Sequence, residues 1–205
     1  MKGITNKTMK DDVKGIFIFD LDGTIDKDVL NSPNKINKIY QGILDTHNTR
    51  DSEFYILTAR RLNDFKDVNN CMCYNIPKKI TDLFKLINQN KTQKGIRWFY
   101  YNENLDETLA YVKQYLSELG LIDKALKYAE VKDADDAANF FMGIQKMLQI
   151  EEMLDKYKDK MVSISFFDDA SYNKKAYEFY QKYINPNFQY VQFFGGEDKP
   201  VFYFR

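Results

Sequence analysis

The segment that most constrains the fold is an unbroken apolar run, Ile16-Phe17-Ile18-Phe19, that leads directly into the acidic turn Asp20-Leu21-Asp22-Gly23-Thr24. A short run of β-branched and aromatic residues is typical of a strand that is buried on both faces. Such strands form parallel sheets, and ligands bind beyond the carboxyl ends of those strands. Asp20 and Asp22 would stand at such a place, where two neighbouring carboxylates favour a divalent cation.

The same pattern occurs twice more along the chain. The apolar run 54–57 ends in Thr58, and the strand-like segment 162–167 ends in Asp168-Asp169. A predicted amphipathic helix separates the first two runs, and a strand–helix–strand order implies a right-handed parallel crossover. We therefore expect Thr58 to lie beside the Asp20 turn, with the later acidic pair at a third strand end.

The remaining segments predict further elements of a single domain. We expect residues 1–14 to be a lead-in and residues 15–205 to be the domain, with a possible small cap or elaboration within 61–130. Apolar periodicity predicts helices at 33–46, 80–87, 105–119, 140–157 and 171–183, and strands at 96–101, 125–131, 191–194 and 201–204. This order of elements predicts an α/β fold with a mostly parallel sheet.

Composition excludes some classes of partner. The 205 residues carry 30 Lys and Arg against 30 Asp and Glu, and this balance is unlike that of a protein that coats nucleic acid. The two cysteines, Cys71 and Cys73, are too close for a useful disulfide loop, and no nearby histidine completes a zinc set. We find no signal-peptide core and no apolar run of about 20 residues that would span a membrane. We expect a cytoplasmic protein with no membrane contact and no evident obligate protein partner.

The motif Asp20-Leu21-Asp22-Gly23-Thr24 resembles the first motif of the haloacid dehalogenase-like (HAD) superfamily, most of whose members are magnesium-dependent phosphatases that use an aspartyl-phosphate intermediate. The later segments follow the order of that family: a Ser or Thr after a strand, then a Lys, then an acidic pair after a strand. The resemblance covers residues 15–183, most of the chain. It implies a Rossmann-like three-layer α/β/α sandwich and a phosphomonoester hydrolase that requires Mg²⁺.

The resemblance also implies a role for each motif residue. Asp20 would be the nucleophile and a metal ligand, and Asp22 would be the general acid/base and would bind the metal through its backbone carbonyl. Thr58 would hydrogen-bond a phosphoryl oxygen. Asp168 would complete the magnesium shell, with Asp169 as a further ligand or as its support.

A lysine is also needed, because negative charge on the phosphoryl group must be met in the transition state. Lys146 and Lys132 are the two candidates. Lys146 lies 22 residues before Asp168, about one helix and one strand, whereas Lys132 lies 36 residues before it. We favour Lys146 on this spacing. Lys146 nevertheless falls off the apolar face of its predicted helix, as a surface lysine would, so both candidates stay open.

We expect the substrate to be a phosphorylated small molecule, a nucleotide or a nucleic-acid end, and we expect Gly23, Thr24 and Arg60 to contact it. A polynucleotide 3′-phosphate is one option, because residues 57–60 and 167–169 also resemble the phosphatase domain of polynucleotide kinase-phosphatases. Here Ala59 replaces the glycine of that family's Ser-Gly-Arg motif, and no Arg directly follows the acidic pair. Two alternatives remain: a non-catalytic binding protein with the HAD fold, and a phosphotransferase of the same fold.

Overall fold

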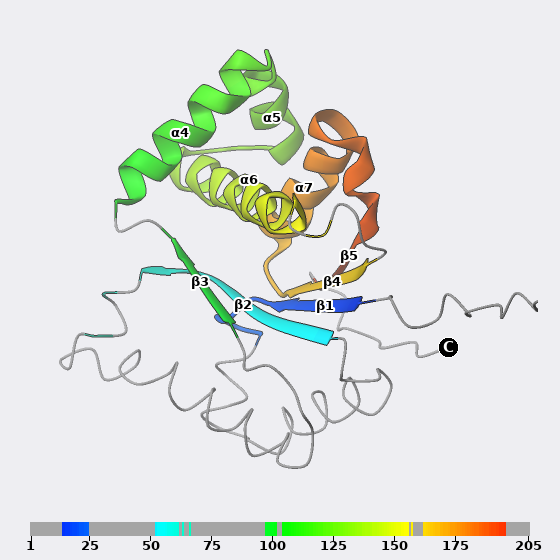
Figure 1. Cartoon of the computed structure of the whole chain (residues 1–205). Coiled ribbons are helices and arrows are strands. Elements are labelled where there is room, and N and C mark those ends of the chain that lie inside the picture. Colours follow the sequence, from blue (N-terminus) through cyan, green and yellow to red (C-terminus); the bar gives the residue numbers. More distant parts are fainter. Residues whose placement is uncertain are drawn as a thin grey trace, which may run out of the picture.

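A five-stranded sheet organises the computed structural model, and every pairing among the described strands is parallel. The structure describes residues 14–24, 52–61, 63, 66, 97–101, 104–155, 157 and 162–195. The strands are β1 (Lys14–Phe19), β2 (Ser52–Arg61), β3 (Arg97–Tyr101), β4 (Val162–Asp168) and β5 (Val191–Gly195). Their order across the sheet is β3-β2-β1-β4-β5 (Figure 1). The predicted α/β class with a parallel sheet is confirmed.

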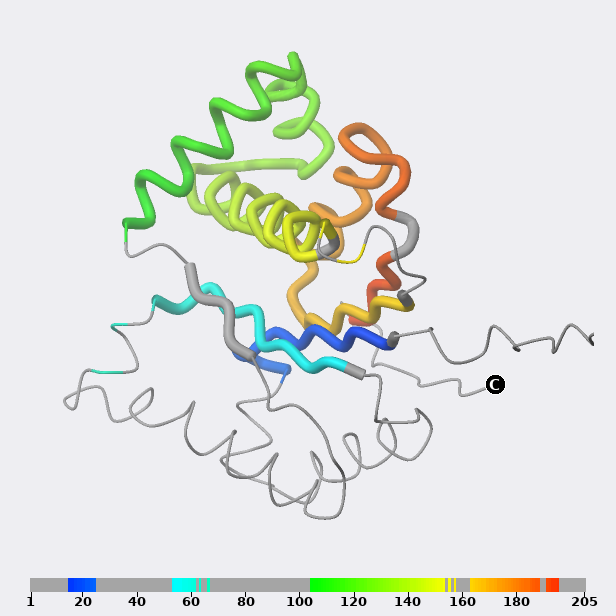
Figure 2. Tube along the Cα trace, viewed as in Figure 1, coloured from blue at the N-terminus to red at the C-terminus, as the bar shows by residue number. Residues whose placement is uncertain are grey.

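The topology places a switch point next to β1. The chain passes from β1 to β2 and β3 on one side, and then to β4 and β5 on the other side of β1. Figure 2 shows β1 in dark blue between β2 in cyan and β4 in gold. Ligands of open α/β sheets bind beyond the carboxyl ends of the strands at such a switch point. The predicted site therefore belongs between β1 and β4.

The strand registers bring the carboxyl ends of β1 and β4 level with each other. Phe19 pairs with Phe167 in β4 and with Ile56 in β2. Residues Asp20 and Asp168 thus become neighbours. The second strand is longer than the sequence predicts, because β2 continues to Arg61 alongside β3 after an irregularity in their register. Thr58 consequently lies within β2 and not beyond its end.

The described helices all lie on one side of the sheet (Figure 1). They are α4 (Leu105–Glu118), α5 (Ile122–Ala129), α6 (Ala134–Asp155) and α7 (Ser171–Phe179), followed by the π-helical turn η3 (Tyr180–Ile184) and the 3-10 turn η4 (Pro186–Tyr190). Helices α6 and α7 pack on each other, α4 packs on α6, and α5 packs on α7. The architecture is compatible with a Rossmann-like fold. Among the described residues no helix covers the opposite face of the sheet, so the three-layer sandwich stays a prediction.

The apolar runs 16–19 of β1 and 54–57 of β2 are buried on both faces of the sheet, as their composition predicts. Toward the helices, Ile18 and Tyr55 join a core with the α6 side chains Phe140, Ile144 and Met147. On the opposite face, the rings of three neighbouring strands stack in a row, with centroids 4.8 and 5.0 Å apart, formed by Phe19, Phe167 and Phe194. Such offset ring stacking adds to the gain from apolar burial.

Several predicted elements are confirmed, and one is wrong. The strand at 96–101 and the helix at 105–119 correspond to β3 and α4, and the Asn104 side chain caps α4 by accepting from the backbone N–H groups of Asp106 and Glu107. The segment 125–131 was expected to be a strand but forms α5. Its burial has a helical period, because less exposed residues recur every three or four positions while Lys124 and Lys127 are exposed; among these less exposed residues are Ile122, Ala125, Leu126 and Ala129.

Other predictions are confirmed only in part or concern residues that the structure does not describe. The helix expected at 171–183 is α-helical only to Phe179 and continues as η3. The predicted helices at 33–46 and 80–87, the predicted strand at 201–204 and the two cysteines lie outside the described residues. The described helices that fall within 61–130 are α4 and α5, which pack on α6 and α7, and a cap or elaboration in this range stays a prediction.

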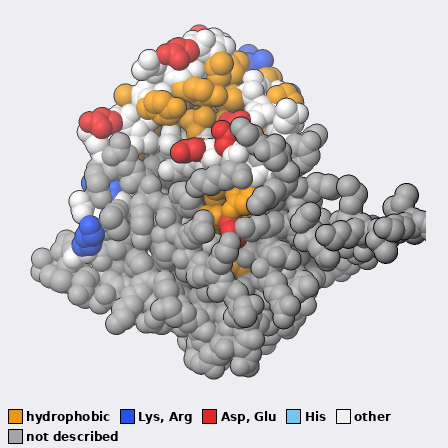
Figure 3. All heavy atoms as spheres, viewed as in Figure 1, with side chains coloured by type: hydrophobic (Ala, Val, Ile, Leu, Met, Phe, Trp, Pro, Cys, Tyr) orange, Lys and Arg blue, Asp and Glu red, His pale blue; other side chains and the backbone are white. Residues whose placement is uncertain are grey.

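The outer surface of the helical layer is partly apolar. Hydrophobic side chains are visible on it in the space-filling view (Figure 3), and the large exposed ones among the described residues are Leu105, Tyr111 and Leu119. Within the described ranges, none of the helices has both the length and the apolar character that crossing a membrane requires.

Helices α6 and α7 approach closely at Gly143. A Cβ atom at this position would lie 2.6 Å from the Cβ of Ala176 and 2.9 Å from Oδ1 of Asn173. Real Cβ atoms do not come so close to other atoms, so the glycine is needed for the helices to touch. This contact fixes α6 against α7 one turn before Lys146.

We expect Gly143→Ala to lower the free energy of unfolding by about 1–3 kcal/mol, because the added methyl group overpacks the contact with α7. Helix propensity alone would give the opposite sign, a gain of about 0.5–1 kcal/mol. Urea unfolding measures the difference. Asn139→Ala, at an exposed position of α6, is the control. A Gly143→Ala protein more stable than the parent would contradict the close packing.

Candidate active site

The acidic turn begins where β1 ends and is tied directly to β4. The backbone N–H of Asp20 donates to the carbonyl oxygen of Phe167 over 2.8 Å. Gly23 has a φ of 79°, and a Cβ atom there would lie 2.0 Å from Oδ2 of Asp169. Only glycine adopts this backbone conformation readily and leaves room for the carboxylate. The sequence Asp-Leu-Asp-Gly thus turns sharply beneath the acidic pair that follows β4.

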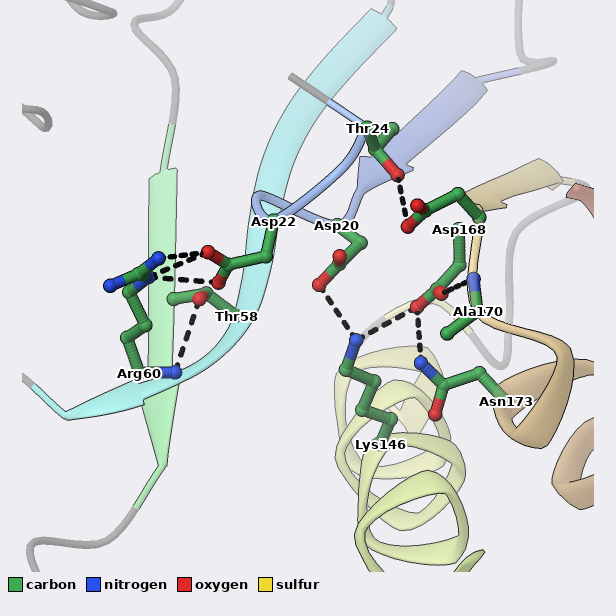
Figure 4. Close-up of polar contacts among 10 residues, drawn as sticks. Asp20, Asp22, Thr24, Thr58, Arg60, Lys146, Asp168, Ala170 and Asn173 are labelled. Atoms are coloured by element: carbon green, nitrogen blue, oxygen red, sulfur yellow. Dashed lines mark hydrogen bonds and ion pairs between the residues drawn. The ribbon is translucent and has the colours of Figure 1, made fainter. Parts of the chain in front are cut away.

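Lys146 of α6 joins the two strand ends. Its Nζ donates to Oδ1 of Asp20 over 2.7 Å and to Oδ2 of Asp168 over 2.8 Å (Figure 4). Lys146 is only 2% exposed. The interpretation of Lys146 as a surface residue is therefore wrong: α6 is buried on more than its apolar face, because its polar side also faces the strand ends. Lys132 is exposed in the connection before α6.

Asp168 is held in place by two further donors. Asn173 Nδ2 donates to its Oδ2 over 2.7 Å, and the backbone N–H of Ala170 donates to its Oδ1 over 2.9 Å. Asn173 is buried and was missed by sequence reasoning. The position of Asn173 in the sequence could have suggested this role, because Asn173 lies in the first turn of the helix that follows Asp168 and Asp169.

Three carboxylates form a cluster that can hold a metal ion. Ligand oxygens of Asp20, Asp168 and Asp169 all lie within 4.8 Å of one another. Oxygen donors in this arrangement are those that Mg²⁺ prefers. Among the described residues, the second carboxylate oxygen of Asp20 accepts no hydrogen bond, which leaves it for a metal or a substrate. Asp22 does not bring its carboxylate into this cluster, and its backbone carbonyl stays a predicted ligand.

The Asp22 carboxylate instead forms an ion pair with Arg60. Arg60 Nε donates to Oδ1 and Oδ2 of Asp22 over 2.8 and 2.9 Å, and Nη2 also contacts Oδ1. The pair lies at the rim, since the Asp22 side chain is 40% exposed and the Arg60 side chain is 28% exposed. Thr58 is fully buried, and its Oγ1 accepts from the Arg60 backbone N–H over 3.1 Å.

These residues surround a pocket of about 470 Å³, which is lined by Asp20, Asp22, Gly23, Ala59, Lys146, Asp169, Ala170 and Tyr172. The predicted catalytic residues Asp20, Asp22 and Lys146 are thus brought together. Thr58 and Arg60 are not lining residues, but they flank Ala59 in the sequence, and Arg60 contacts the lining residue Asp22. The Thr24 hydroxyl donates to Asp169 Oδ1 at 3.5 Å, a weak contact, and Thr24 does not line the pocket. Ala170 and Tyr172 are lining residues that the sequence did not suggest.

The electrostatics of the pocket are dominated by burial of charge. Burial raises the pKa of Asp20 from 3.8 to about 7, Lys146 opposes this rise, and the neighbouring Asp168 adds to it. Burial also raises the pKa of Tyr172, so its hydroxyl stays protonated at neutral pH. Near pH 7, Asp20 is therefore poised between an acid and a carboxylate, and a bound cation would favour the carboxylate.

Comparison with known proteins finds no match among protein-family models, curated proteins or solved structures. The pocket combines a carboxylate with one oxygen unengaged by the described residues, a buried lysine against it and two more carboxylates close by. This set can bind a cation and direct a carboxylate at an electrophile.

We expect Lys146→Met to lower the free energy of unfolding by about 3 kcal/mol or more at pH 8, because it leaves two buried carboxylates without their cation. The loss should shrink toward pH 5, where Asp20 takes up a proton and no longer needs a partner. Urea unfolding at the two pH values measures this. The matched control is Lys132→Met, an exposed position that should change little. Equal effects of the two substitutions would exclude the buried ion pairs.

Mg²⁺ affinity should depend on pH through Asp20. A proton on this carboxyl competes with the metal, so affinity should rise about tenfold per pH unit below pH 7 and level off above it. Calorimetric titration in two buffers of different ionisation enthalpy should show about one proton released per ion at pH 6 and almost none above pH 8. Asp20→Asn should abolish this release. Binding without proton release at pH 6 would contradict the assignment of Asp20 as a ligand.

Proposed function

We propose that the chain is a Mg²⁺-dependent phosphomonoester hydrolase that acts through an aspartyl-phosphate on Asp20. The observation that carries the proposal is the position of the Asp20 carboxylate, which lines the pocket at the switch point with one oxygen on Lys146. The resemblance of the Asp20 turn to the first HAD motif supports the same reaction. A HAD-like fold is part of the proposal.

Asp20 attacks phosphorus in the first step. One of its carboxylate oxygens forms a bond to phosphorus as the bond to the alcohol oxygen breaks, which splits a difficult hydrolysis into two easier displacements. Lys146 keeps the other oxygen in place and offsets negative charge at the reacting centre. Asn173 and Ala170 hold Asp168, so the second partner of Lys146 is also fixed.

Asp22 moves the protons. It lies two residues beyond Asp20 and also lines the pocket. It gives a proton to the departing alcohol oxygen and then takes one from the water that attacks the aspartyl-phosphate, which releases phosphate and restores Asp20. The Arg60 pair holds Asp22 at the rim, so Asp22 must change partner during this cycle.

The carboxylate cluster of Asp20, Asp168 and Asp169 would hold Mg²⁺. When bound, the ion cancels repulsion between the phosphate dianion and the carboxylates and orients the phosphoryl group. Thr24 and Gly23 keep Asp169 over the turn, so they support the cluster and Thr24 reaches the substrate only indirectly.

The substrate is proposed at the level of a phosphorylated small molecule, a nucleotide or a nucleic-acid end, including a polynucleotide 3′-phosphate. A phosphatase assay distinguishes these classes when it is run on a panel of nucleotides, 3′- and 5′-phosphorylated oligonucleotides, sugar phosphates and phosphopeptides. Thr58 is proposed to orient Arg60 through its backbone contact, as well as to reach a phosphoryl oxygen. A cytoplasmic location also stays a prediction.

We expect the protein to hydrolyse para-nitrophenyl phosphate with Mg²⁺ between pH 5 and 8, and to lose this activity with a chelator. Asp20→Asn should lower kcat by about 10³-fold or more, because the amide cannot form the phosphoryl ester. Asp123→Asn, an exposed position on α5, is the matched control and should leave the rate unchanged. Release of p-nitrophenol is the measurement.

Other outcomes separate the alternatives. No turnover by folded protein with Mg²⁺, together with phosphate binding, would favour a non-catalytic binding protein. Transfer of phosphate to an added alcohol in preference to water would identify a phosphotransferase. Undiminished turnover in Asp20→Asn would exclude the aspartyl-phosphate.

A further inference from the structure

Two cations contact carboxylates that line the pocket, Lys146 from within the lining and Arg60 from beside it, and they differ in how firmly they are held. Lys146 has a side-chain exposure of 3% and contacts two carboxylates that are themselves almost fully buried. Arg60 has a side-chain exposure of 28% and faces Asp22, which is 40% exposed. A buried ion pair that loses a partner leaves an unsatisfied charge, whereas a pair at the rim is screened by water and exchanges partners at little cost.

In the proposed reaction, the exposed pair of Arg60 and Asp22 lies beside the leaving group of the substrate. In the proposed reaction Asp22 donates to the alcohol oxygen of the substrate, so its partner Arg60 lies on the leaving-group side of the pocket. The guanidinium engages both oxygens of Asp22, and these are the oxygens that must reach the substrate. Release of Asp22 therefore leaves a planar bidentate donor beside the leaving group, and such a donor fits a phosphate or a carboxylate.

The backbone prepares Arg60 for this exchange. Its N–H is anchored on the buried Thr58 Oγ1, while its guanidinium stands at the rim. The base of the side chain is thus fixed, and only the guanidinium has to change partner. Ala59, the residue before Arg60, lines the pocket, and its side chain is only a methyl group.

We propose that Arg60 exchanges Asp22 for a second anionic group on the substrate, so that the pocket selects phosphate monoesters whose alcohol portion carries another phosphate or phosphodiester close to the scissile bond. In the unliganded chain, Asp22 occupies the site of that anion. Binding of the substrate anion releases Asp22 toward the leaving oxygen. Recognition of the second anion by Arg60 and release of the general acid Asp22 toward the leaving oxygen are then the same event. This inference rests on the proposed hydrolase function.

Binding to a chain that cannot turn over tests the exchange. In the Asp20→Asn protein with Mg²⁺, calorimetry compares thymidine 3′-monophosphate with thymidine 3′,5′-bisphosphate and with a dithymidine dinucleotide that carries a 3′-phosphate. We expect the second anion to tighten binding about tenfold, as a charge-assisted bidentate contact does. The latter two probes separate a free bisphosphate from a nucleic-acid end as the source of the anion, and tighter binding of either supports the proposal.

A double-mutant cycle isolates the effect of the Arg60–Asp22 ion pair on bisphosphate affinity. In the same background, Asp22→Asn should tighten bisphosphate binding about three- to tenfold more, because Arg60 no longer has to leave its partner. Arg60→Gln should reduce the ratio of bisphosphate to monophosphate affinity to about one, and the effect of Asp22→Asn on that ratio should then vanish. Arg60→Lys should restore only part of the ratio, since it keeps the charge but not the bidentate geometry. Thermal unfolding confirms that each variant is folded.

Two results would overturn the exchange. The first is a ratio that survives Arg60→Gln, and the second is an effect of Asp22→Asn that persists without Arg60, which would indicate general relief of negative charge. These readouts need no catalysis, so they stand if hydrolysis is absent. Conversely, wild-type turnover that shows no preference for the second anion would refute the exchange while leaving the hydrolase function intact.

Discussion

The whole site depends on one buried ammonium group placed between two carboxylates. Lys146 enters from the helical layer, and Asp20 and Asp168 come from adjacent strands, so three elements distant in sequence meet at one nitrogen. Each of these charges would be costly to bury alone. Together they lock α6 to the carboxyl ends of β1 and β4, and the close contact of α6 with α7 at Gly143 sets the depth at which the lysine arrives.

The balance of charge at this point is the property on which the proposed reaction relies. Asp20 keeps one oxygen on Lys146, and burial raises its pKa to about 7. A carboxylate held in this state gains from any cation that enters. Asp168 and Asp169 add further negative charge, so the three carboxylates together could hold a cation, which we propose to be Mg²⁺.

The contrast between the inner and outer ion pairs gives the pocket a fixed part and an adjustable part. Lys146 is surrounded by protein and keeps its partners, whereas Arg60 and Asp22 are partly hydrated and can separate. In the proposed function, such a site would be preorganised where bonds are made and adaptable where the substrate is recognised. The proposed acid/base and the proposed anion receptor would then be the two halves of one ion pair, which would couple recognition to proton transfer.

The sequence by itself determined the parallel α/β class, the β1 and β4 strands and the candidates Asp20, Asp22 and Asp168, because buried strands carry continuous apolar runs and their ends carry the polar residues. It failed where a local pattern was ambiguous, as for α5, whose short apolar segment fits a strand or a helix. Only the tertiary structure decided between Lys146 and Lys132, found Asn173 and paired Asp22 with Arg60. Burial of a polar side chain depends on which neighbouring elements pack around it. The apolar periodicity of a single helix does not indicate those neighbours.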